Sequence, residues 1–180
     1  MADDLTDPRA VSALRSVAHP VRIRILSLLT AEAMSAAEVA RALDLTHANA
    51  SYHLRVLHEA GELVVESEEK IRGGVAKRYR YVVADAPSAT PATNDDRIAY
   101  VRAIAHEVTR RQSQHERGTG QMSDIETWVD PETWVEAVEL LRRASDLLHE
   151  NARPPGAPGT QHVSASLFAF EMTKPQEDAR

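Results

Sequence analysis

Apolar residues recur at helical spacing through the first thirty residues and predict two helices. The first covers 10–18 and ends there because a residue that precedes proline is disfavoured in the α region, and Pro20 follows His19. Pro20 suits the first turn of the next helix, which we expect to run over 21–30 with Ile25 and Leu29 on one face.

Two cap signals predict two further helices separated by a short turn. Ser35 and Glu38 have the spacing of a capping box and open a third helix. Thr46 is the expected N-cap of a fourth helix over 47–60, and Gly61 is the residue that ends it.

A β-hairpin is predicted directly after these helices. The strands are expected over 62–66 and 77–83, the second with basic and aromatic residues in alternation. Gly73 and Gly74 lie between them and indicate a turn.

The second half of the chain begins with a segment rich in Pro, Ala, Ser and Thr, 85–93, which we interpret as a linker. A long helix is expected over 94–117, and it carries a narrow apolar seam. This seam is either packed on its own domain or forms a dimer interface of coiled-coil kind, and we favour the dimer. Its residues are Ile98, Val101, Ala105 and Val108.

A final helix and two strands are expected in the C-terminal part. Asp130 and Pro131 cap a helix that runs to about residue 151, with an expected buried stripe made by Trp134, Val138, Leu141 and Leu148. The alternating segment 163–172 predicts a strand paired with 122–129.

These elements predict a mainly α fold with a small amount of β structure. Residues 8–84 form a winged helix-turn-helix domain and 85–93 a linker. Residues 94–172 form a helical dimerisation and effector region with a small two-stranded β element, and 173–180 form a disordered tail.

Charge is distributed unevenly. The net charge is −6, yet residues 1–84 carry equal numbers of acidic and basic residues, so the whole excess of acid lies beyond them. Residues 70–80 carry five basic residues and no acid. A chain that is acidic overall can therefore still offer a basic edge to phosphates.

Composition excludes several classes of site and protein. The chain has no cysteine, which excludes disulfides and thiolate metal sites. No apolar run approaches the roughly 20 residues of a membrane helix, and the first seven residues do not resemble a secretory signal, so we expect a cytoplasmic protein with no membrane partner. Linear signatures of enzymes are absent as well, and we expect neither catalysis nor a bound cofactor.

Three segments, 19–26, 35–45 and 49–63, resemble the winged-helix regulators of the ArsR type. The specific part is the string S-x-H-L-x-x-L-x-x-A-G-x-L, which begins at Ser51 and is followed by a strand. The resemblance covers about 75 residues. It implies a dimeric regulator of double-stranded DNA, most often a repressor released by a ligand. The chain departs from the metal-sensing members because it lacks their cysteines.

Within that resemblance the fourth helix enters the major groove and the hairpin, or wing, lies along the DNA backbone. The expected contacts of the recognition helix are Thr46, His47, Asn49, Ser51, Tyr52 and Arg55. The expected contacts of the wing with phosphates or the minor groove are Arg72, Lys77, Arg78 and Arg80. The wing cations have an alternative role, since basic residues also protect the edge of a sheet from aggregation.

Four aromatic residues of the C-terminal part are interpreted as the core of a small unit or, with less weight, as the lining of a pocket for an apolar small-molecule effector. They are Trp128, Trp134, Phe168 and Phe170. The eight histidines show no ligand pair at helical spacing, so we expect no metal. The sequence therefore predicts a homodimeric DNA-binding repressor. Two alternatives stay open, a winged-helix module that binds protein without DNA and a regulator that senses a divalent cation through His, Asp and Glu.

Overall fold

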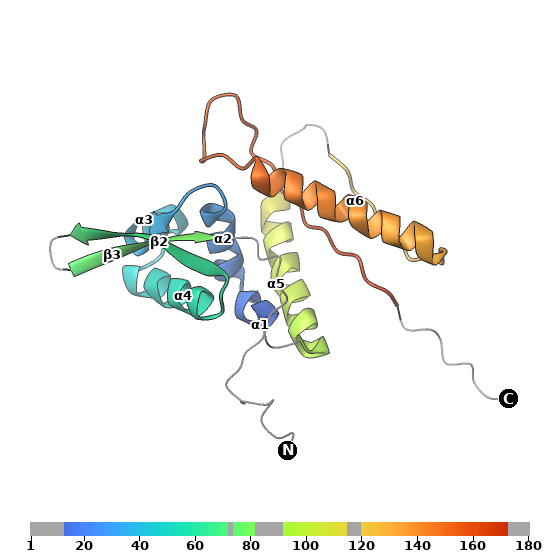
Figure 1. Cartoon of the computed structure of the whole chain (residues 1–180), viewed down its shortest axis with the longest axis horizontal. Helices are drawn as coiled ribbons and strands as arrows, with labels where there is room; N and C mark the ends of the chain where they lie inside the picture. The colour runs from blue at the N-terminus through green and yellow to red at the C-terminus, as the bar shows by residue number, and fades with distance from the viewer. Residues whose placement is uncertain (1–12, 72–73, 82–91, 115–119, 173–180) are drawn as a thin grey trace, which may run out of the picture.

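The computed structural model describes residues 13–71, 74–81, 92–114 and 120–172. Within them the chain forms helices around one small antiparallel sheet whose strand order is β1-β3-β2 (Figure 1). The helices are α1 (Ala13–Val17), α2 (Pro20–Leu29), α3 (Ala36–Leu43), α4 (His47–Glu59), α5 (Asn94–Gln112) and α6 (Pro131–Glu150). The strands are β1 (Met34–Ser35), β2 (Leu63–Ile71) and β3 (Gly74–Tyr81). The predicted mixed fold with little β structure is confirmed.

The predicted caps begin and end the helices of the first half. The Ser35 hydroxyl accepts from Glu38 N–H while the Glu38 carboxylate accepts from Ser35 N–H, which completes the capping box of α3. Asp44 ends α3 in the left-handed conformation, with φ 54°, and so turns the chain sharply toward α4. Thr46 then caps α4 by accepting from Asn49 N–H.

One apolar core joins α2, α3, α4 and the start of β2. Ile25, Leu29, Val39 and Leu57 are fully buried in it, and Leu63 brings β2 against the helices. Tyr79 and Tyr81 pack on the same core from β3. Burial from four elements fixes the angle at which α4 is held, because a packed core permits few alternative arrangements.

The sheet is larger than the sequence predicted. The strand β1 was not expected, and it pairs with β3 so that Ser35 lies opposite Arg78. Strands β2 and β3 extend further toward the tip of the hairpin than predicted. Their register shifts between Val65 and Ser67, which leaves Glu66 as an extra residue of β2.

Helix α5 packs on α1 and α2. Its Tyr100, Ala103 and Ile104 meet Ile23 of α2 in a second, smaller cluster. This packing uses a face other than the predicted seam, and the division of the chain at 85–93 stays a prediction.

The two strands predicted in the C-terminal part do not form. Residues 120–130 and 160–172 are extended without strand pairing, and every one of them is exposed. An alternating sequence fits any extended backbone, and it makes a strand only where another strand completes the hydrogen bonds. None of the residues of α6 is buried either: Trp134 and Leu141 of the predicted stripe are partly buried, and Val138 and Leu148 are exposed.

Candidate nucleic-acid interface

Helix α4 presents one polar face to solvent and buries the opposite face. Thr46, His47, Asn49, Tyr52 and Arg55 are exposed, and Ser51 is partly buried at the edge of that face. The six predicted contact residues therefore lie together on or beside one outward surface. The helix carries no acidic residue in its first turn, so no carboxylate there would repel a phosphate.

Apolar side chains hold that face in place from behind. Ala50 and Leu57 are fully buried and Leu54 is 1% exposed. The polar row is therefore exposed without any rearrangement of the side chains that anchor α4.

A buried histidine lies beneath the middle of α4. His53 is 5% exposed, and its ring centroid lies 4.9 Å from that of His19 and 5.3 Å from that of Tyr52. Burial, with contributions from His19 and Arg22, lowers the pKa of His53 from 6.5 to about 4. His53 is therefore neutral at pH 7, as expected for a structural residue.

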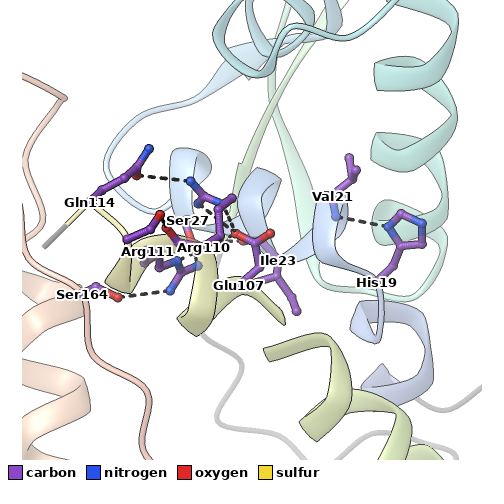
Figure 2. A network of polar contacts seen from close by, with 10 residues as sticks. His19, Val21, Ile23, Ser27, Glu107, Arg110, Arg111, Gln114 and Ser164 are labelled. Atoms are coloured by element: carbon purple, nitrogen blue, oxygen red, sulfur yellow. Dashed lines mark hydrogen bonds and ion pairs between the residues drawn. The ribbon is translucent and has the colours of Figure 1, made fainter. Parts of the chain in front are cut away.

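His19 links this cluster to the start of α2. Its Nδ1 accepts from Val21 N–H at 3.2 Å, so the imidazole is the N-cap of the helix (Figure 2). Burial and the neighbouring Arg22 lower the pKa of His19. Both imidazoles thus favour the neutral form, and their proximity was not predictable from the sequence.

Arg78, a predicted phosphate contact, is bound to protein groups in the single chain, and its contact with phosphate stays a prediction. Its guanidinium donates to both carboxylate oxygens of Glu38 at 3.1 and 2.9 Å and to the Ala33 carbonyl at 2.6 Å. The Arg78 side chain is 25% exposed and that of Glu38 is 29% exposed. The same Glu38 that caps α3 therefore ties α3 to β3.

The other wing cations have acidic partners as well. Arg80 donates to Glu66, the extra residue of β2, and Lys77 lies 3.8 Å from Glu68. The predicted contacts of Arg80 and Lys77 with phosphates stay predictions, and each would compete with the ion pair of that residue. Arg72 lies outside the described residues. The glutamates of β2 were visible in the sequence, but only the strand register shows which cation each one neutralises.

On α4, Arg55 carries a weaker pairing. It lies 3.9 Å from Glu59, and both side chains are more than 60% exposed. Its guanidinium carbon lies 6.0 Å from the centre of the Tyr52 ring. An exposed ion pair of this length contributes little stability, so Arg55 can turn to a phosphate at small cost.

The predicted dimer residues form an exposed row on α5. Ile98, Val101 and Val108 are 38–44% exposed, and Ala105 is exposed beside them. The opposite side of α5 holds a buried carboxylate, Glu107, which accepts from Arg110 at 2.9 Å (Figure 2). Arg111 from the same helix reaches Ser27 of α2 and Ser164 of the C-terminal segment, each at 3.4 Å.

The four C-terminal aromatic residues are exposed or only partly buried in the single chain. Trp128 is 78% exposed and Phe170 68%, with Phe168 exposed and Trp134 partly so. The expectation that they form a core is wrong for the single chain. The described residues contain no group of three or more His, Asp or Glu side chains arranged to bind a metal ion. No helix among them combines the length and apolarity needed to cross a membrane.

Comparison with known proteins identifies the first part of the chain. Residues 17–66 match the family model of a helix-turn-helix domain, which confirms the helix-turn-helix resemblance there. Among solved structures the chain is similar to one described as "Crystal structure of Possible transcriptional regulator for arsenical resistance", at 20% identity and a TM-score of 0.34. That alignment covers 60% of this chain and 100% of the other. A search of curated proteins finds no significant match.

Proposed function

We propose that this chain, whose residues 17–66 form a helix-turn-helix domain, is a sequence-specific regulator of transcription that binds double-stranded DNA. The observation that carries the proposal is the polar row of α4, exposed on a helix whose other side is locked into the core. A helix of this size fits the major groove, and its Asn, Ser, Thr and His side chains can hydrogen-bond base edges. The chain acts by binding and not by catalysis.

The regulator works as a homodimer that reads a two-fold site. Two copies of α4 then enter successive major grooves about 34–36 Å apart. The exposed seam of α5 supports a helix-to-helix contact between the copies, because it is apolar and is left uncovered by the packing of α5 on α2. In keeping with the ArsR resemblance, the protein is proposed to be a repressor that a ligand at the C-terminal part releases.

Asn49→Ala should weaken specific binding about tenfold while leaving binding to unrelated duplex unchanged. Asn49 is exposed on α4, and a paired contact with an adenine edge is worth about 1–3 kcal/mol of discrimination. The preferred duplex is first selected from a random library, and affinity is then measured by fluorescence anisotropy.

Arg41→Ala is the matched control for that experiment, since Arg41 is exposed on α3 outside the polar row of α4. The base-reading role of Asn49 is excluded if both variants lose the same affinity on selected and unrelated duplex. If the wild-type chain selects no duplex at all, the winged helix is a protein-binding module instead.

A further inference from the structure

The C-terminal part, residues 120–172, exposes far more apolar surface than a folded unit of its size can sustain. Fourteen large apolar side chains between Met122 and Met172 are at least 39% exposed. At roughly 150–250 Å² for each large side chain, they present on the order of 1,500 Å² to solvent.

The apolar stripe of α6 is continuous and free of charge. Trp134, Val138, Leu141 and Leu148 lie along one side of the helix, whereas the acidic residues Glu132, Glu139 and Asp146 lie on the other side. Arg142 bridges Glu139 and Asp146 on that polar side. The charged face is thus suited to solvent and the apolar stripe to a protein partner.

The two segments that flank α6 form no strand pair among the described residues. Residues 120–130 and 160–172 do not pair with each other, although the sequence predicts a strand pair there, and their backbone hydrogen bonds within the described residues are confined to Asp130 and Thr160 at the segment ends. Unpaired strands of this kind are templates for a strand from another chain. A second copy of the same protein brings the same two segments.

We infer that residues 120–172 complete their fold on a second copy of this chain, and that this contact is the larger part of the dimer interface. A stable interface buries about 800 Å² per partner, so covering half of the exposed apolar side chains suffices. A two-fold axis places the uncharged stripe of α6 against its equivalent and keeps both acidic faces outward, which avoids repulsion between like charges. The inference rests on the proposed dimer but is independent of DNA binding.

The contact has a natural probe, because Trp128 and Trp134, both in this part, are the only tryptophans of the chain. We expect their fluorescence to be red-shifted and fully quenched by acrylamide at nanomolar protein. On raising the protein to micromolar concentration the emission should shift to the blue and quenching should fall at least twofold, in step with dimer formation measured by analytical ultracentrifugation.

Charge variants separate the two apolar surfaces. Leu141→Glu on the stripe of α6 should raise the dimer dissociation constant at least 30-fold, whereas Val101→Glu on the α5 seam should raise it less. Arg143→Glu, on the polar side of α6, is the matched control and should change it less than threefold. Circular dichroism of each variant checks that the helices of the first half stay folded.

Three results would overturn the inference. In the first, the dimer forms but its tryptophans stay exposed, and Val101→Glu dissociates it whereas Leu141→Glu does not. That result would assign the interface to α5 and leave the proposed dimer intact. A chain that stays monomeric at tens of micromolar would remove the second copy altogether, and the proposed dimer with it. A dimer equally weakened by Arg143→Glu would show that the stripe has no special role.

Discussion

Lowering the pH from 7.5 to 5 should cost the protein about 2 kcal/mol of its free energy of unfolding through His53 alone. The pKa of His53 is lowered from 6.5 to about 4 in the folded protein. Above pH 6.5 the side chain is neutral in both states, so stability is complete. Between pH 6.5 and 4 His53 binds a proton in the unfolded chain but stays neutral in the folded chain, so the free energy of unfolding falls. Each unit of difference between the pKa of His53 in the two states corresponds to about 1.4 kcal/mol.

The groups around His53 reinforce this dependence. His19 and Arg22 face it from α2, and both lower its pKa, while Tyr52 touches it from its own helix. Protonation of His19 also removes the acceptor that caps α2. We therefore expect the packing of α2 against α4 to weaken first on acidification, and DNA affinity to fall with it.

Urea denaturation at pH 7.5 and pH 5 measures the effect. His53→Phe should flatten the pH profile, even if the variant is less stable at pH 7.5. His47→Gln, on the exposed face of α4, should keep the wild-type profile. A His53→Phe protein that loses as much stability as wild type between the two pH values would rule out His53 as the source.

Arg78→Ala should lower the free energy of unfolding by about 2–3 kcal/mol, the second large effect. The substitution removes three hydrogen bonds and leaves the carbonyl of the buried Ala33 and the partly buried Glu38 carboxylate short of a donor. Nη1 of Arg78 serves Glu38 while Nη2 serves the Ala33 carbonyl, so Arg78→Lys, which has one nitrogen for both partners, should recover only part of the loss.

The same variant tests whether Arg78 serves the DNA. Because its donors point at Glu38 and Ala33, Arg78→Ala should leave the slope of log K against log salt unchanged, although a loosened α3 lowers affinity overall. Lys77→Ala is the neighbouring control, and its exposed pair with Glu68 should contribute no more than about 0.5 kcal/mol. A salt slope reduced by about one in Arg78→Ala would confirm the phosphate contact predicted from the sequence.

The first half of the fold was predictable because its signals are local. The capping box at Ser35, the cap at Thr46 and the glycine after α4 each act within a few residues, and all three are found where predicted. The exposed row of α4 followed from the same periodicity.

What could not be predicted depends on contacts between residues far apart in the chain. Arg78 and Glu38 are separated by 40 positions, and only the pairing of β1 with β3 brings them together. The meeting of His19 with His53 depends in the same way on how α2 crosses α4. The prediction of two C-terminal strands was wrong for a different reason. An alternating pattern is compatible with an extended backbone but does not show whether another strand is present to pair with it.

The ion pairs between the cations of β3 and the glutamates of β2 have a consequence for how the protein finds its target. A phosphate that approaches Lys77 or Arg80 must first displace a glutamate, so contact with an arbitrary stretch of duplex returns little free energy. We expect residence on random genomic DNA to be brief and the search to proceed by repeated release and recapture, with little sliding. Only the base contacts that α4 makes at a matching site would offset the free energy lost when these ion pairs break. The glutamates therefore weaken binding to non-matching DNA more than binding to the specific site.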